Sequence, residues 1–188
     1  MNVQTAAILF LMVFELMVVT SLAIMLVSNF ISGIHGAPYM PMRGKLIHGL
    51  LTFGEVKPED IFYDLGSGDG RVLRTAVRDF HVARAIGYEA APWPFWKSRW
   101  LVRHSGFRNI EIRNQNFFDA DLSEATCIYA YLLIKPIDRL AGKFAKELKS
   151  GTRLIIPSFP IDIQKHPQFH LKKSEKIGSI TAYLYVKV

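Results

Sequence analysis

Cysteine is almost absent from this chain, since Cys127 is the only one among 188 residues. An internal disulfide and a cysteine metal cluster are therefore both excluded. Because Cys127 lies within an apolar run typical of a strand, we expect a buried thiol that packs like a small apolar side chain. His166 and His170 stand four residues apart, but Pro167 between them disfavours a continuous helix that would present both to a metal. We expect surface or structural roles for these histidines and no metal site.

Charge is nearly absent from the first 42 residues, where Glu15 is the only formally charged side chain. The chain has 23 Lys and Arg against 16 Asp and Glu, a formal net charge of +7, so the part after residue 42 carries +8. Half of the residues are hydrophobic. This composition excludes a disordered or collagen-like chain and favours one domain of ordinary size with an appendage.

The apolar run over residues 6–31 predicts a transmembrane helix. At about 1.5 Å per residue it would be roughly 39 Å long, enough to cross a hydrocarbon core of about 30 Å. No Lys or Arg precedes the run, which is also too long for a signal peptide, so we expect an uncleaved anchor. Arg43 and Lys45 follow closely. By the positive-inside rule, we expect a single-pass membrane protein with its C-terminal portion on the cytoplasmic side.

Glu15 lies a few residues from the middle of this expected span. A carboxylate at that depth costs several kcal/mol unless it is protonated or paired. Two interpretations stay open: a protonated side chain tolerated in a single-pass helix, or a contact with a polar group of another membrane protein.

After the span, strands and helices alternate. Residues 32–42 contain two glycines and two prolines and are expected to form a linker or structured loop, followed by a short helix over residues 45–53. Apolar and aromatic runs predict strands over residues 61–65, 85–89, 110–113, 127–133, 152–158, 170–175 and 181–188. Helical spacing predicts helices over residues 72–80, 94–104 and 136–148. This order predicts an α/β fold with a doubly wound parallel sheet that ends in a hairpin.

A glycine-rich loop follows the first of these strands. Gly66, Gly68 and Gly70 form a G-x-G-x-G pattern that allows a tight turn from strand to helix and a close approach of a ligand to the backbone. Arg71 stands where the dinucleotide pattern G-x-G-x-x-G has its third glycine, which disfavours NAD. The acid that ends the strand, Asp64, is placed to attract the amino group of an amino-acid-like ligand.

A second acid, Glu89, closes the next strand about 20 residues after the loop, the position from which a carboxylate accepts ribose hydroxyls. In this combination the sequence resembles the class I S-adenosylmethionine-dependent methyltransferases, whose first motif is an acid followed by G-x-G-x-G and whose second is an acid ending the next strand. The resemblance implies a Rossmann-like seven-stranded sheet and S-adenosyl-L-methionine as the cofactor. The implied cofactor-binding residues of the first two motifs are Asp64, Gly66, Ser67, Gly68, Asp69, Gly70 and Glu89.

Further stretches resemble the ATP synthase c-subunit lysine methyltransferases and their prokaryotic relatives, over roughly residues 36–160. These stretches are Ala37-Pro38-Tyr39-Met40-Pro41, Tyr131-Leu132-Leu133, residues 147–153 and Ser158-Phe159. The Pro-Tyr-x-Pro stretch lies over the cofactor in that family, which implies a cofactor contact for Tyr39, although Met42 replaces the usual Ser or Thr. Asn116, followed by Phe117, stands where an acid usually meets the adenine. The implied division is an anchor over residues 1–34, a linker and cofactor-covering segment over 35–54, and a methyltransferase domain over 55–188.

The expected reaction is methyl transfer, an in-line displacement for which the protein supplies alignment. No general base is obligatory, and no catalytic residue is assigned. A lysine acceptor must be neutral, and an apolar pocket favours that form. Tyr39, Tyr131 and Phe159 are candidates for an aromatic wall around the acceptor, with ordinary core packing as the alternative for each.

The expected acceptor is a lysine of a protein, and we expect that protein to be associated with the membrane. A lipid or small lipophilic amine is the alternative acceptor, and a non-enzymatic scaffold that only binds the cofactor is the alternative function. Residues 131–136 lack the Asn/Asp-Pro-Pro-aromatic pattern of enzymes that methylate amino groups of bases, so no nucleic acid is expected. Residues 96–103 interleave aromatic and basic side chains, as proteins that bind single-stranded nucleic acid do. Against that alternative we interpret Trp96 and Trp100 as core residues, with the cations around them solvated or facing anionic lipid.

Overall fold

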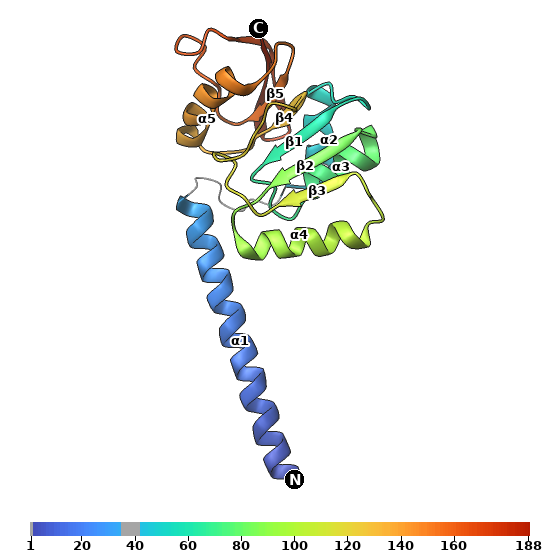
Figure 1. Ribbon diagram of the computed structural model, residues 1–188, viewed down its shortest axis with the longest axis vertical. Helices are drawn as coiled ribbons and strands as arrows, with labels where there is room; N and C mark the ends of the chain where they lie inside the picture. The colour runs from blue at the N-terminus through green and yellow to red at the C-terminus, as the bar shows by residue number, and fades with distance from the viewer. Residues whose placement is uncertain (1, 35–41) are drawn as a thin grey trace.

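The computed structural model describes residues 2–34 and 42–188, and its centre is a seven-stranded sheet in the order β3-β2-β1-β4-β5-β7-β6 (Figure 1). The strands are β1 (Ile61–Leu65), β2 (Arg84–Tyr88), β3 (Ile110–Arg113), β4 (Cys127–Tyr129), β5 (Arg153–Pro157), β6 (Phe169–Ile177) and β7 (Ile180–Lys187). The helices are α1 (Val3–Ile34), α2 (Gly44–Phe53), α3 (Arg71–Phe80), α4 (Pro92–His104) and α5 (Ile134–Glu147).

Strands β1 to β5 are parallel, and β7 pairs antiparallel with both β5 and β6. Each parallel crossover runs through a helix or a long connection, as parallel pairing requires. The predicted α/β fold with seven strands and a terminal hairpin is confirmed. Because the parallel strands share a direction, the ends of β1, β2, β3, β4 and β5 meet at one carboxyl edge, where ligands of such sheets bind.

One strand is shorter than predicted. The expected strand over residues 127–133 ends at Tyr129, and α5 begins at Ile134. Ala130 still donates its N–H to Ile155 of β5 at 3.1 Å, but the chain then leaves the sheet for the helix. Leu132 is buried nonetheless. An apolar run cannot distinguish a strand from a buried connection, which explains the wrong boundary.

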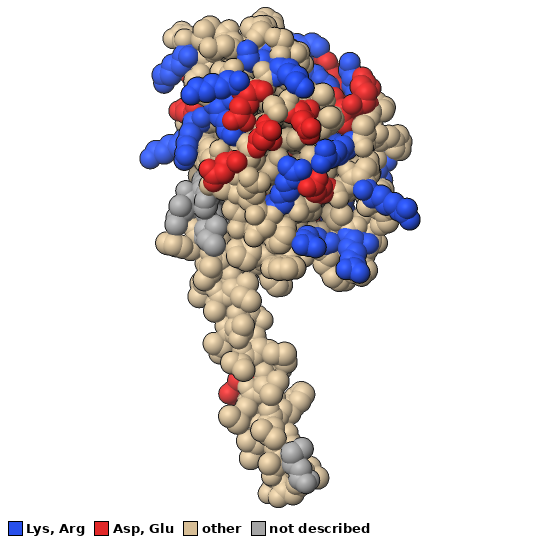
Figure 2. All heavy atoms as spheres, viewed as in Figure 1, with Lys and Arg blue, Asp and Glu red and all other residues tan. Residues whose placement is uncertain are grey.

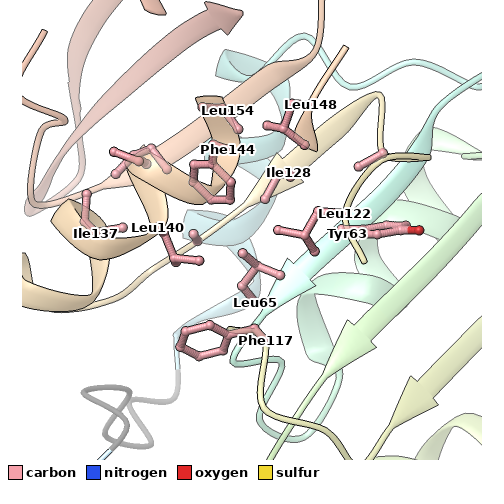
Figure 3. Packing of buried hydrophobic residues seen from close by; sticks show 14 of the residues in the cluster. Tyr63, Leu65, Phe117, Leu122, Ile128, Ile137, Leu140, Phe144, Leu148 and Leu154 are labelled. Carbon is pink, nitrogen blue, oxygen red and sulfur yellow. The ribbon is translucent and has the colours of Figure 1, made fainter. Parts of the chain in front are cut away.

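Apolar side chains cover both faces of the sheet. On one face Ile137, Leu140 and Phe144 of α5 pack against Leu65 and other residues of the first core cluster (Figure 3). On the other face α2 and α3 contribute to the second cluster. The buried residues of α2 are Ile47, Leu50, Leu51 and Phe53. Helix α2 is therefore packed on the domain, while the predicted division at residues 54 and 55 stays a prediction.

Helix α1 extends away from this domain and is solvent-exposed along most of its length (Figures 1 and 2). Its segment Val3–Ser28, with mean hydropathy 2.5, is long and apolar enough to cross a membrane by length and composition. Glu15 is exposed on this helix. Near its end, Ser28 Oγ accepts a hydrogen bond from the backbone N–H of Trp93 in α4 at 3.0 Å. The candidate span therefore ends against the first turn of α4.

Helix α4 differs from the prediction in what it exposes. Trp96 and Trp100 are 62% and 61% exposed, so their interpretation as core residues is wrong. The buried face of α4 consists instead of Pro94, Phe95, Ser98 and Val102. Tryptophans at i and i+4 share one face of a helix, but their spacing does not say which face meets the core.

A buried ion pair at the amino edge of the sheet was not predicted. Asp60, just before β1, is 2% exposed and pairs with Arg153 at the start of β5. It also accepts hydrogen bonds from the Thr126 hydroxyl at 2.7 Å and the Lys57 N–H at 2.7 Å. Arg153 donates to the carbonyl of Glu55 as well. This network connects the chain segments that begin β1, β4 and β5.

Candidate active site

The glycine loop turns the chain sharply from β1 into α3. Gly66, Gly68 and Gly70 have φ angles of 81°, 55° and 72°, in the left-handed region that glycine adopts without steric cost. The Gly66 and Ser67 N–H groups both donate to the carbonyl of Tyr88, at 2.9 and 3.0 Å. The loop is therefore fixed to the end of β2, and its glycines are required by backbone conformation.

Glu89 is the residue that directly follows β2, and its carboxylate holds two backbone groups. Oε2 accepts the N–H of Gly68 at 2.8 Å, and Oε1 accepts the N–H of Ala91 at 2.8 Å. The two acids predicted for the site are thus placed at one edge, since Asp64 lies on β1 beside β2. The same carboxylate that is the predicted ribose ligand also sets the position of the glycine loop.

Gly87 explains how the loop approaches β2 so closely. A Cβ at this position would lie 2.5 Å from Leu73 Cδ1 and 2.7 Å from both Ser67 Cβ and Oγ. Real Cβ atoms essentially never approach other heavy atoms this closely, so the site requires glycine here. Sequence reasoning missed Gly87, because a glycine inside a strand pattern gives no more than a hint of close backbone approach.

Asp64 is buried, with 2% of its surface exposed. Burial, and then the nearby carboxylates of Glu89 and Asp69, raise the pKa of Asp64 well above its usual range. Its Oδ2 has no hydrogen-bond partner among the described residues, and neither does the buried hydroxyl of Ser67. A buried acid among other acids favours a cationic ligand, because a positive charge would offset both the desolvation and the repulsion.

Asp69 is held by basic side chains. Arg71 binds its carboxylate through Nε and Nη2, at 2.8 and 2.7 Å, and Lys97 Nζ lies 3.4 Å away. Arg71 Nη1 also donates to the carbonyl of Met42 at 2.8 Å, and the Tyr129 hydroxyl contacts Met42 Sδ at 3.7 Å. The arginine that stands in place of a third glycine therefore joins the loop to the segment that precedes α2.

The region after β3 supplies the next predicted residues. Asn116 Oδ1 accepts the N–H of Phe118 at 3.0 Å, which forms a local turn. Phe117 is 4% exposed and belongs to the first core cluster. Asn114, which sequence reasoning missed, donates from Nδ2 to the carbonyls of Glu89 and Ala90 at 2.9 and 3.4 Å. It therefore fixes the backbone of the second acid.

The three candidates for the aromatic wall are placed as follows. Tyr131 lies two residues after β4 and packs partly buried against the second cluster. Phe159 lies two residues after β5 and is half-buried. Both follow parallel strands at the carboxyl edge that also holds Asp64. Tyr39 lies outside the described residues.

These residues fit the predicted cofactor. S-adenosylmethionine carries an amino group and a sulfonium, which suit a buried acid without a partner, and ribose hydroxyls, which suit a carboxylate at the end of β2. The positive-φ glycines leave no side chain between the backbone and such a ligand. Cys127 is buried in β4, and burial raises the pKa of its thiol to about 12, so it has no reactive role there.

Comparisons with known proteins show which family the chain resembles. A family model described as the ANTKMT methyltransferase domain matches residues 64–168. A protein-lysine N-methyltransferase of Saccharolobus islandicus is 36% identical over 150 residues, which cover 79% of this chain and 92% of that protein. The ATP synthase c-subunit lysine N-methyltransferase of Mus musculus is 28% identical over 128 residues, which cover 65% of this chain and 49% of that protein.

A solved structure is also similar. An RNA methyltransferase from Salinibacter ruber, in complex with S-adenosyl-L-homocysteine, superimposes with a TM-score of 0.72. It is 28% identical, and the match covers 79% of this chain and 94% of that chain. The fold and the site thus define an S-adenosylmethionine-dependent methyltransferase. More particularly, the chain belongs to the family of the ANTKMT methyltransferase domain, and the predicted fold, cofactor and enzyme class are confirmed.

Proposed function

We propose that this chain is a membrane-anchored protein-lysine methyltransferase whose acceptor lysine lies close to the cytoplasmic surface of the membrane. The contact between Ser28 and Trp93 carries the proposal. Trp93 is four residues after Glu89, so the end of the candidate span lies beside the element that leaves the cofactor edge. At this position the carboxyl edge of the sheet would encounter lysines of other membrane proteins more often than lysines of proteins in solution.

The proposed cofactor contacts are those derived from the sequence. Asp64 offers a buried negative charge to the amino group, and Glu89 offers its carboxylate to the ribose. Gly66, Ser67, Gly68, Asp69 and Gly70 form the loop under the ligand. Asn116 and Phe117 lie on the adenine side, after β3. Tyr39 is proposed as a covering contact from the preceding segment.

The chemistry divides between cofactor and protein. When bound, S-adenosylmethionine supplies an activated methyl group. The protein orients the acceptor amine for in-line approach and keeps it neutral. Tyr131 and Phe159 are proposed to line the acceptor channel, where partial exclusion of water lowers the pKa of an entering lysine. No described residue needs to act as a general base, because an acceptor amine that enters neutral already has its lone pair available.

The anchor and its orientation are part of the proposal. Residues 6–31 are predominantly apolar, and the basic residues nearest to the span, Arg43 and Lys45, follow it. The positive-inside rule then favours a cytoplasmic catalytic domain. The names of the relatives support a lysine of a protein as the acceptor, since they describe protein-lysine N-methyltransferases.

A labelling experiment tests the proposed activity. Membranes that contain the full chain are incubated with methyl-labelled S-adenosylmethionine, and proteins and lipids are then separated. We expect label on lysine in a protein band, found as a mass shift in multiples of a methyl group. Label only in the lipid extract would support an amine-containing lipid as acceptor instead. Absence of label, with cofactor binding retained, would support a scaffold. Asp64→Ala serves as the inactive control.

A separate experiment tests the anchor. Alkaline carbonate extraction removes peripheral proteins but leaves spanning helices in the bilayer. We expect the full chain to stay in the membrane pellet, and added protease to reach the domain only from the cytoplasmic side. Recovery of the chain in the supernatant would contradict the proposed anchor, whatever the labelling shows.

A further inference from the structure

All three tryptophans of this protein lie on one exposed face of α4. Trp93, Trp96 and Trp100 are 52%, 62% and 61% exposed. Their spacing of three and four residues places them in one stripe along the helix. Large aromatic side chains exposed together mark an interaction surface, and the methyl-transfer site at the sheet edge makes no use of them.

Cations share this face. Arg99 lies over the rings of Phe95 and Trp96, at 5.7 and 5.6 Å from their centroids, and Arg103 follows at the next turn. Residues 90–110 contain no Asp or Glu. The acids that flank this stretch are both engaged elsewhere. Glu89 accepts backbone N–H groups of the glycine loop and of Ala91, and Glu111 is paired with Arg84 and Arg113 at 2.8 and 2.7 Å. The face is therefore aromatic and positive.

Between α4 and β3 the surface forms an open hollow of about 640 Å³. The lining consists of apolar, aromatic and basic side chains and one acid, whose carboxylate is paired with Arg84 and Arg113. These residues are Trp96, Arg99, Trp100, Val102, Arg103, Ile110, Glu111 and Ile112. An apolar floor with a cationic rim fits a phospholipid, whose acyl chains are apolar and whose phosphate is anionic. The composition of the hollow thus points to the same class of partner as the stripe.

The position of α4 in the fold favours a membrane surface as its partner. Helix α4 lies across the end of the domain from which α1 extends (Figure 1), and basic side chains lie along this end of the domain (Figure 2). The hydrogen bond from Trp93 to Ser28 joins the start of α4 to the last residue of the candidate span. If that span crosses the bilayer, the first turn of α4 lies at the membrane surface, where tryptophan and arginine side chains are both stabilised.

We infer that the face formed by Trp93, Trp96, Arg99, Trp100 and Arg103 lies in the headgroup region of a bilayer that contains anionic phospholipid. The inference rests on the proposed anchoring through α1 and goes beyond it. An anchor alone leaves the domain free to rotate about the end of the helix. A second attachment through α4 holds the carboxyl edge of the sheet at a fixed height and angle above the membrane, toward acceptors at its surface.

Intrinsic fluorescence tests this inference without any label, because every tryptophan of the chain belongs to the proposed face. The full chain is reconstituted into vesicles of phosphatidylcholine and phosphatidylglycerol whose acyl chains are brominated near the headgroup. We expect strong quenching relative to vesicles of unbrominated lipid, and protection from the soluble quencher acrylamide relative to the chain in detergent. Unquenched emission with full access to acrylamide would overturn the inference.

A charge reversal tests the role of the cations. Each basic residue at a membrane surface contributes about a fivefold factor in affinity, so Arg99→Glu with Arg103→Glu should reduce bromolipid quenching at least about twofold. The matched control is Lys149→Glu with Lys176→Glu, two exposed lysines away from α4, which should leave quenching unchanged. Equal quenching in both double variants and the unmodified chain would contradict the anionic part of the inference.

Failure of the inference can be separated from failure of the anchor. A chain that resists carbonate extraction but shows no bromolipid quenching keeps its anchor and refutes contact through α4. Recovery of the chain in the carbonate supernatant would contradict the proposed anchor and, with it, the contact of α4 with the bilayer. Tryptophan quenching by added single-stranded RNA, with none by brominated lipid, would assign the face to nucleic acid and would also overturn the inference.

Discussion

The carboxylate of Glu89 accepts a hydrogen bond from the backbone N–H of Gly68 at 2.8 Å, across 21 positions of the sequence. This bond joins the two motifs from which the cofactor was predicted. A residue expected only to bind the ligand therefore also shapes the loop on which the ligand rests.

Glu89→Ala should weaken S-adenosylmethionine binding by at least about 100-fold. It removes the predicted ribose contact and the acceptor for two backbone N–H groups, and a hydrogen bond to a charged group contributes about 1.5–3 kcal/mol. Isothermal titration calorimetry measures the affinity, and circular dichroism checks that the fold is retained. Glu175→Ala, on the exposed edge strand β6, is the control and should bind like the unmodified chain. Wild-type affinity in Glu89→Ala would remove this residue from the site.

Asp64→Asn should change how the stability of the ligand-free protein depends on pH. Burial and two neighbouring carboxylates raise the pKa of Asp64 in the folded state, so the folded protein holds this proton at pH values where the unfolded chain has lost it. The free energy of unfolding should therefore fall as the pH rises above the unfolded pKa of about 3.9 and through the raised folded value.

The asparagine variant lacks this titration. Its stability relative to the unmodified chain should improve as the pH rises from 4 to 8, because only the unmodified chain has a carboxyl group that must ionise in buried, acidic surroundings. Denaturant unfolding at several pH values measures the difference. The variant should also fail to bind the cofactor. If the free energy of unfolding varied with pH in the same way in both proteins, the pKa of Asp64 would not be raised by its surroundings.

Asp60→Ala should destabilise the domain by about 3–5 kcal/mol, because it leaves the guanidinium of Arg153 in the protein interior without its carboxylate. Denaturant unfolding measures the effect. The control is Glu59→Ala, which removes an exposed ion pair with Lys57 and should cost no more than about 1 kcal/mol. The double variant Asp60→Asn with Arg153→Met should recover part of the loss. Equal, small effects at both sites would contradict a structural role for the buried pair.

Gly87→Ala should displace the glycine loop, because the new methyl group on β2 would collide with Ser67. The added methyl group would lie 2.7 Å from Ser67, so the loop must move, and overpacking of this kind costs about 1–3 kcal/mol. We expect weaker cofactor binding together with lower stability. Gly142→Ala provides a matched control, because a Cβ in the middle of α5 would meet nothing within 4 Å. It should stabilise the helix by about 0.5–1 kcal/mol. Unchanged binding in Gly87→Ala would show that the loop adapts.

Patterns among neighbouring residues were sufficient to predict the fold and the glycine motif. The glycine pattern, Asp64 and Glu89 stand at the ends of strands whose apolar runs are short and bounded, and parallel strands must bring those ends to one edge. The terminal hairpin followed from two consecutive strand patterns. The predicted end of β4 was wrong. The apolar run over residues 130–133 fits a strand as well as it fits the connection that the structure shows between β4 and α5.

The amino-acid sequence by itself determined the order of strands and helices, the family, the cofactor and the apolar anchor candidate, because each depends on patterns among neighbouring residues. Only the tertiary structure decided which face of α4 meets the core. It also decided that Asp60 pairs with Arg153 across 93 positions, and that Gly87 and Asn114 support the loop and Glu89. These relationships depend on which distant segments pack together, and packing is set by the whole sheet rather than by local spacing.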